Sequence, residues 1–321
     1  MRLSALSPLA LALLLPGCGG ANPTVGPTTE SQLAQPLKNV RVFTANRGGP
    51  SVLGFSVKAS GDVAPAVNIS GSKTGLSDPD SLAIDAAGYI YAANDSGTEV
   101  QVFSPNADGN VKPKRVIGGT SSHLGPTEGL LIDPSGNLWV SDFADEAITE
   151  YPPGAHGNVA PIDTISGSNT QLSTPVGMAM DSLGKLFVAS IGSAAIVAFS
   201  SGASGNAKPA VTISGANTKL SRPFSLGFDS KGRLLVADES AGILVFAKNA
   251  KGNATPVAHI TSVLSAAGVA ADSKDHIWVA EFGGATIDEF ARNANGNATP
   301  LRKISGASTT LNGPNYIAFG H

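Results

Sequence analysis

Residues 129–142 read GLLIDPSGNLWVSD, and this stretch decides the fold because the chain repeats it. The other copies are SLAIDAAGYIYAAN at 81–94, GMAMDSLGKLFVAS at 177–190, SLGFDSKGRLLVAD at 225–238 and GVAADSKDHIWVAE at 268–281. Their central aspartates follow one another at steps of 48, 48, 48 and 43 residues. A period of this length is typical of a chain that builds one supersecondary unit per repeat.

Each repeat contains four short pieces with strand character. An apolar piece such as 82–84 precedes a D-x-x-G turn, whose glycine accepts the positive φ of a tight hairpin. A β-rich second piece follows, and an A-x-G-N-x-x-P turn separates the third piece from the fourth. The third piece ends in Phe55, Phe103, Tyr151, Phe199, Phe246 or Phe290, and the fourth in Ile69, Ile117, Ile165, Ile213, Ile260 or Ile304. Four strands in about 40–50 residues predict one blade of a β-propeller.

The two ends of the chain predict how the ring closes. Second pieces occur six times, and no first piece precedes the earliest of them at 40–43. The missing piece lies at 315–319, where Gly320 is 48 residues after Asp272 and in register with the repeat aspartates. We therefore expect an all-β, six-bladed propeller with four-stranded blades, in which the C-terminal strand pairs with the N-terminal blade and removes an open edge.

The composition fits this architecture and excludes some partners. Only 14% of the 321 residues are charged, while 38 are glycine and 21 are proline, which suits short strands joined by tight turns. The formal net charge of −3 provides no basic footprint for nucleic acid. It also argues against electrostatic attraction to an anionic membrane surface.

The N-terminus has the pattern of an export signal. Arg2 precedes an apolar run over 3–15, which is shorter than the ~20 residues of a membrane span. The stretch LPGC at 15–18 resembles the lipobox of bacterial lipoproteins, and this resemblance implies cleavage before Cys18 and lipid attachment to it. The alternative is an ordinary secretory signal with an incidental cysteine. Because Cys18 is the only cysteine, it has no partner for an intramolecular disulfide.

These features predict a lipoprotein signal peptide at 1–17, a flexible tether at 18–37 and a propeller at 38–321. The tether is rich in Gly, Pro, Thr, Ser and Gln and has no apolar period. We expect the protein to be held at the bacterial cell envelope, with the acylated Cys18 in the lipid bilayer. If the host is Gram-negative, the outer membrane is the expected location.

The repeats resemble the NHL family, whose pattern is roughly P-x-G-[LIV]-A-[LIV]-D-x-x-G-x-[LIV]-[YW]-V-A-D. The resemblance covers about residues 38 to 320 and implies a six-bladed propeller. NHL-like propellers include protein-binding and RNA-binding modules, a peptide-amidating lyase and relatives of calcium lactonases. Two positions depart from the pattern: Asp275 replaces the turn glycine, and Ser190 replaces the closing aspartate.

Two rings of equivalent positions mark the face where loops enter the first strands and leave the second strands. The first ring lies five residues before each repeat aspartate and reads, blade by blade, Asn315, Asp80, Glu128, Val176, Phe224 and Ala267. The second ring closes the second strands and reads Asn46, Asn94, Asp142, Ser190, Asp238 and Glu281. Asn and Asp at such positions commonly bond to turn backbone, so the second ring is interpreted as structural.

The first ring divides into a polar and an apolar half. Asn315, Asp80 and Glu128 would supply oxygen ligands of the kind that calcium prefers. The distantly similar calcium lactonases of the gluconolactonase type carry Glu, Asn and Asp at strand starts around the channel, although ordinary loop polarity also explains the pattern. Val176, Phe224 and Ala267 predict an apolar surface for a ligand.

Motifs for other chemistry are missing from the sequence. The histidines fall at different repeat positions, and no G-x-S-x-G elbow is present. The uniform repeats favour a non-catalytic, monomeric binding module that presents its channel face to a protein, peptide or glycan. A metal-dependent hydrolase, with calcium held by Asn315, Asp80 and Glu128, is the main alternative. A structural envelope protein without a ligand is the second alternative.

Lipid anchoring yields the first testable prediction. Replacing Cys18 by Ser is expected to move the protein from the membrane fraction to the soluble fraction, because the acyl chains are the main apolar anchor. Fractionation after growth with labelled palmitate measures both location and acylation. A wild-type protein that incorporates no label would contradict the anchor.

Overall fold

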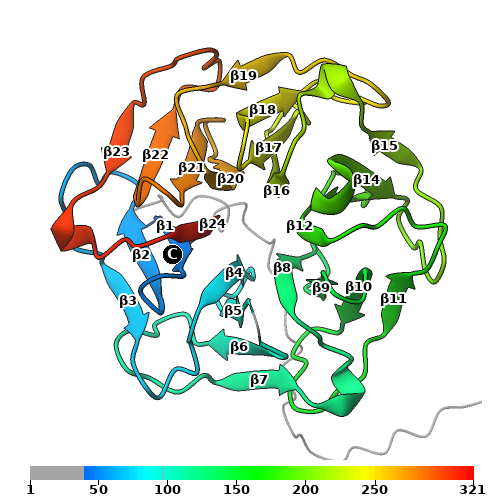
Figure 1. Cartoon of the computed structure of the whole chain (residues 1–321). Coiled ribbons are helices and arrows are strands. Elements are labelled where there is room, and N and C mark those ends of the chain that lie inside the picture. Colours follow the sequence, from blue (N-terminus) through cyan, green and yellow to red (C-terminus); the bar gives the residue numbers. More distant parts are fainter. Residues whose placement is uncertain (1–39, 96) are drawn as a thin grey trace, which may run out of the picture. The chain divides into compact units, whose positions relative to one another are not determined.

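The computed structural model describes residues 40–95 and 97–321. These residues form 24 strands in six four-stranded antiparallel sheets, which are arranged as blades in a ring (Figure 1). This confirms the six-bladed β-propeller. The predicted signal peptide, the tether and Cys18 lie outside the described residues.

Each blade places one strand at the centre of the ring and three strands progressively further out. From the centre outward, the first three blades are β24 (Pro314–Gly320), β1 (Arg41–Asn46), β2 (Ser51–Ser56), β3 (Val67–Ser70); β4 (Pro79–Ile84), β5 (Ile90–Asn94), β6 (Glu99–Phe103), β7 (Arg115–Gly118); and β8 (Thr127–Ile132), β9 (Leu138–Asp142), β10 (Ala147–Tyr151), β11 (Asp163–Ser166).

The remaining blades follow the same order. They are β12 (Pro175–Met180), β13 (Leu186–Ser190), β14 (Ala195–Phe199), β15 (Val211–Ile213); β16 (Pro223–Phe228), β17 (Leu234–Asp238), β18 (Gly242–Phe246), β19 (Ala258–Ile260); and β20 (Ala266–Ala271), β21 (Ile277–Glu281), β22 (Thr286–Phe290), β23 (Arg302–Ile304). Short 3₁₀ turns interrupt the loops at η2 (Thr120–Ser122), η3 (Ile191–Ser193), η4 (Ala216–Thr218) and η5 (Ala307–Thr309).

The ring closes between the two ends of the described chain. Strand β24 pairs antiparallel with β1, with Val42 opposite Phe319 and Ala45 opposite Asn315. At the rim, Ile304 forms a parallel bridge with Gly61 of the first blade. The same isoleucine-to-glycine bridge joins each of the other five pairs of neighbouring blades. The circle is therefore closed both at the centre and at the rim.

The repeat motifs stabilise turns and core. In each D-x-x-G turn the aspartate Oδ1 accepts backbone N–H bonds from the second and fourth residues after it, as Asp133 does from Ser135 and Asn137. Asp275 takes the glycine position with φ 64°, a conformation that Asp tolerates better than most residues. The six aromatic residues that end the third strands are all buried, each contributing roughly 1.5–3 kcal/mol.

The shortened repeat changes one loop on the face where the inner strands begin, which we call the mouth face. The connection over 261–265 has no 3₁₀ turn, whereas η2, η4 and η5 occupy the corresponding loops of other blades. Leu264 in this loop is largely exposed. The residues missing from the shortened repeat therefore include residues of a mouth-face loop.

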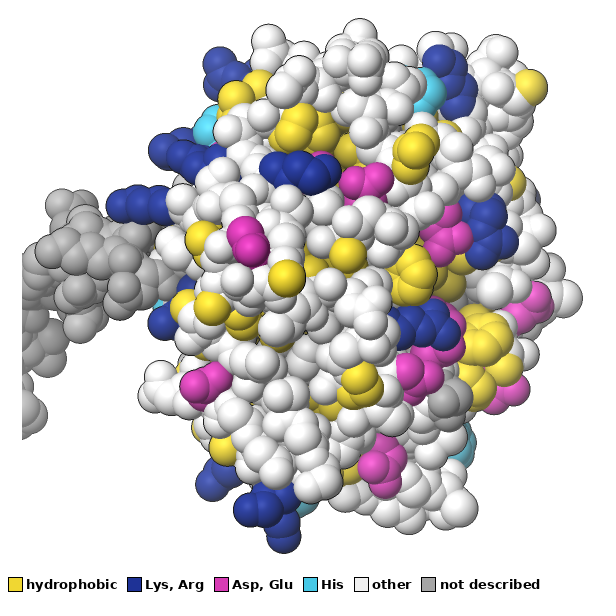
Figure 2. Space-filling model, turned by 60° about the vertical axis from the view of Figure 1, so that its left-hand side comes forward, with side chains coloured by type: hydrophobic (Ala, Val, Ile, Leu, Met, Phe, Trp, Pro, Cys, Tyr) yellow, Lys and Arg dark blue, Asp and Glu magenta, His cyan; other side chains and the backbone are white. Residues whose placement is uncertain are grey.

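The surface agrees with the low charge of the sequence. On the side drawn in Figure 2, basic and acidic side chains are interspersed, and uncharged groups cover most of the area. No helix among the described residues is long and apolar enough to cross a membrane.

Closure yields the second prediction. Removing residues 313–321 is expected to lower the melting temperature by about 10 °C or more, or to prevent folding. The loss of β24 removes four buried residues, among them the large side chains of Tyr316 and Ile317, and uncovers β1, at a cost on the order of 5 kcal/mol. Removing only the exposed His321 is the control and should change nothing. An unchanged melting curve for the longer deletion would contradict ring closure.

Candidate functional site

The first ring lies on the inner strands at a position where most of them bulge. In β4, Pro79 pairs with Asn94 and Ser81 pairs with Ala93, so Asp80 has no partner across the strand. Glu128, Phe224 and Ala267 are skipped in the same way in their own blades. A bulge of this type re-aims the side chain of the extra residue.

Glycine lets the inner strands approach one another just after this ring. A Cβ atom on Gly129 would lie 2.2 Å from the carbonyl oxygen of Val176, and one on Gly177 would lie 2.3 Å from that of Phe224. Backbone therefore packs on backbone between these blades, and larger residues are excluded. The side chains of the first ring gather above this constriction.

The polar half of the ring forms one hydrogen-bonded group. The side chain of Asp80 is fully buried, and its Oδ1 accepts a bond of 2.5 Å from Asn315 Nδ2. The Arg47 Nη1 atom lies 3.1 Å from the same oxygen, and Nη2 bonds the carboxylate of Asp95. The structure thus brings Asn315 and Asp80 together and adds Arg47 and Asp95, which the sequence analysis missed.

Glu128 completes this group as a neutral acid. It is 9% exposed and shares hydrogen bonds with Asp80 and Asp95. Burial, followed by the charge of Asp80, raises the pKa of Glu128 to about 11. Burial also raises the pKa of Asp80, opposed by the Glu128 hydrogen bond and the Arg47 charge. Since two carboxylates cannot share a hydrogen bond without a proton, Glu128 carries it at neutral pH.

The apolar half is closed off by an aromatic pair. Val176, Phe224 and Ala267 are all buried, and the Phe224 ring lies 5.6 Å from that of Tyr316, measured between centroids. Tyr316 has φ 47° and occupies the position that other inner strands give to Gly or Ser. Its hydroxyl is buried without a partner, and burial, with the charges of Asp80 and Glu128, raises the pKa of Tyr316 well above its usual value.

A third ring lies one residue beyond the second and faces the mouth. It reads Arg47, Asp95, Phe143, Ile191, Glu239 and Phe282, in blade order. All of these except Phe282 line a cavity of about 480 Å³, which we call the mouth pocket. The other lining residues are Glu128, Thr174, Val176, Arg222 and Phe224. Of the predicted site residues, Glu128, Val176 and Phe224 therefore line the pocket, whereas Asp80, Asn315 and Ala267 do not.

Five of the six second-ring side chains bond to backbone, in agreement with the structural interpretation, and Ser190 is the exception. Asp142 accepts bonds from the N–H groups of Gly125 and Ala144, and Asp238 accepts them from Ser221 and Ser240. These bonds fix the loops that carry the third ring. The second-ring side chains therefore support the mouth pocket without lining it.

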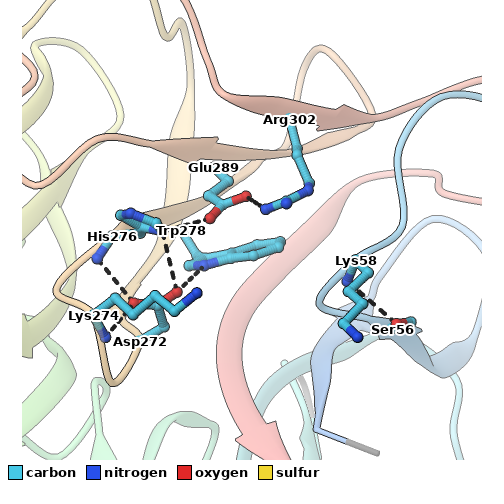
Figure 3. Close-up of polar contacts among 8 residues, drawn as sticks. All are labelled: Ser56, Lys58, Asp272, Lys274, His276, Trp278, Glu289 and Arg302. Atoms are coloured by element: carbon cyan, nitrogen blue, oxygen red, sulfur yellow. Dashed lines mark hydrogen bonds and ion pairs between the residues drawn. The ribbon is translucent and has the colours of Figure 1, made fainter. Parts of the chain in front are cut away.

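A second cluster of ionisable groups lies in the sixth blade, away from the mouth (Figure 3). His276 Nδ1 lies 2.7 Å from Glu289 Oε1 and 3.5 Å from Asp272 Oδ2. In the third blade, Asn137 bridges the equivalent Asp133 and Glu150 at 3.0 and 2.8 Å. Because an amide makes the same bridge, the cluster is interpreted as a brace between strands. The cluster therefore does not indicate a metal site.

Comparisons with known proteins support the fold alone. No family model matches the sequence, and no curated protein matches it significantly. Solved six-bladed propellers are similar in structure. A 6-phosphogluconolactonase candidate from Bacteroides fragilis has a TM-score of 0.62 at 13% identity, over 90% of this chain and 99% of its own. A nidogen/laminin complex has a TM-score of 0.61 at 13% identity, over 88% and 99%. Virginiamycin B lyase from Staphylococcus aureus has a TM-score of 0.53 at 16% identity, over 78% and 76%.

The buried acid yields the third prediction. Because folding raises the pKa of Glu128, its contribution to stability is complete below about pH 4.5 and decreases as the pH rises toward about 11. Replacing Glu128 by Gln keeps a neutral donor and removes this dependence. Between pH 5 and pH 9, the melting temperature of the variant should rise by several degrees relative to that of the wild type. A constant difference across this range would contradict a buried neutral acid.

Proposed function

We propose that the protein is a binding module of the bacterial cell envelope, held by an acyl group on Cys18, that takes a protein, peptide or glycan into its mouth pocket. The observation that carries this proposal is the lining of the pocket. Four apolar side chains, those of Phe143, Val176, Ile191 and Phe224, lie beside two arginines and three carboxyl groups.

The size and chemistry of the pocket fit a bound ligand. Its volume of about 480 Å³ lies within the range of small-molecule and side-chain sites, which combine apolar walls with a few polar groups. Aromatic and arginine side chains are also the groups that dominate binding energies in protein interfaces. Both arginines are paired with carboxylates in this structure, Arg222 with Glu239 at 2.7 Å and Arg47 with Asp80 at 3.1 Å, and both arginine side chains are partly exposed.

The alternative of a metal-dependent hydrolase relies on the contact between Asn315, Asp80 and Glu128. Calcium would need their oxygens as ligands. In this structure, however, the Arg47 guanidinium already neutralises Asp80, and Glu128 retains its proton. The residues therefore do not fit a resident calcium ion as they stand. The lactonase-like neighbour shares 13% sequence identity with this chain, so it supports a common fold but no common active site.

A selection experiment gives the fourth prediction. Peptide display and a glycan array are screened with the wild type, and the ligands obtained are measured against Phe143→Ala. Loss of a half-buried aromatic wall should weaken binding by at least about tenfold. Leu183→Ala, in a largely exposed D-x-x-G turn, is the matched control and should bind as the wild type does. Ligands that bind all three proteins equally, or a failure to select any ligand, would contradict the proposal.

A calcium titration gives the fifth prediction and distinguishes the binding module from the metal-dependent hydrolase. Millimolar calcium should leave the melting temperature of the wild type within about 1 °C of its value without calcium. Arg47 already neutralises Asp80 and Glu128 retains its proton, so calcium should not bind the folded state and stabilise it. A rise of several degrees that Asp80→Asn abolishes would instead support the hydrolase.

A further inference from the structure

Asp80 and Asn315 lie directly behind the lining residue Arg47, and we call this buried polar pair the floor of the mouth pocket. The floor is already bonded by a cationic group of the protein itself. One guanidinium nitrogen of Arg47 bonds Asp80 and the other bonds Asp95, so a single planar group bridges two carboxylates from the neighbouring blade. This is the geometry for which a guanidinium is suited, since its N–H donors point outward in a rigid fork.

Arg47 is the most exposed member of this contact, and Asp80 is the most buried. Arg47 lies in the turn after β1, and its side chain is 36% exposed. Asp80 is fully buried on an inner strand, in a bulge that directs it to the centre. Removing the arginine without replacement would leave a buried charge without a counterion, which is strongly unfavourable. A cation supplied by a ligand would avoid this penalty.

Two buried polar atoms, one on the floor residue Asn315 and one on the adjacent Tyr316, are not bonded by Arg47. The Oδ1 atom of Asn315 and the hydroxyl of Tyr316 are buried without a hydrogen-bond partner. Asn315 is 2% exposed, and its amide nitrogen bonds Asp80, so its free oxygen belongs to the same floor. Buried polar groups are rarely left unpaired, which points to a ligand with more N–H donors than Arg47 directs there.

The walls above this floor suit the rest of a basic side chain. Phe143, Val176, Ile191 and Phe224 are the apolar lining residues and would cover an aliphatic stem, as lysine and arginine stems are commonly covered. Arg222 and Glu239 at the rim offer one donor and one acceptor for peptide groups. The combination is that of a site for a basic side chain on a polypeptide.

We propose that the floor of the mouth pocket binds the guanidinium or ammonium group of a peptide ligand, and that Arg47 fills this position in the free protein. Arg47 then acts as an internal competitor that the ligand displaces. This inference rests on the proposed binding function and specifies the class of its ligand.

The test uses calorimetry with the purified full chain and two peptides, N-acetyl-Phe-Arg-amide and N-acetyl-Phe-citrulline-amide, which differ in charge but hardly in shape. Replacing Arg47 by Ala should increase the affinity for the arginine peptide by at least about tenfold, because the competitor is gone and a charged hydrogen-bonded contact replaces it. The citrulline peptide should bind neither protein measurably. Adding Asp95→Asn to the Arg47→Ala protein should reverse the gain.

Arg47→Gln serves as a second variant if the alanine protein does not fold, since it keeps a donor for Asp80 and loses the charge. Three outcomes would each overturn the inference. The two peptides could bind with equal affinity, or the wild type and the Arg47 variants could bind the arginine peptide equally well. The third is that Arg47→Ala binds calcium but not the arginine peptide. Pocket-dependent ligands without a basic group, found by display, would overturn it while leaving the binding function intact. A display that selects nothing would instead contradict the binding function.

Discussion

The pairing of β24 with β1 is the interaction on which the rest of the structure depends. Each of the other five inner strands is joined to its blade by a short hairpin, whereas β24 reaches its blade only after the chain has completed the circle. All six sheets are covered on both faces by neighbouring sheets only when the ring is complete. The parallel bridge between Ile304 and Gly61 repeats this closure at the rim. Without it, the first and sixth blades would each present an uncovered face and open edges.

The same pairing builds the floor of the mouth pocket. The Thr44 hydroxyl of β1 donates to the carbonyl of Asn315 in β24, and the Arg47 N–H donates to the carbonyl of Gly313. Arg47, from the start of the propeller, and Asn315, from its end, then both bond Asp80 of the next blade. Closure and the polar site therefore share their residues, so the site is an integral part of the fold.

The repeat allowed the blade number, the strand order and the closure to be predicted from the sequence, because each depends on periodic apolar residues and turn aspartates. The first ring was also visible as a periodic position. Arg47 and Asp95 were missed because they lie one residue beyond the strand ends, where the turn backbone decides which side chain faces the mouth. The bulge at Asp80 and the positive φ of Tyr316 have no signature in residue type. Pairing between distant charges such as Arg47 and Asp80 depends on tertiary distance alone.

Amide hydrogen exchange of β24, compared with that of β12, tests the role of closure most directly. Both are inner strands, but β12 continues by a hairpin into its own blade, while β24 is held only by pairing across the chain ends and packing between blades. If the ring opens only as a whole, the hydrogen-bonded amides of both strands should exchange with the same opening free energy, equal to that of global unfolding. Exchange of β24 at a clearly lower free energy, while β12 remains protected, would contradict the account.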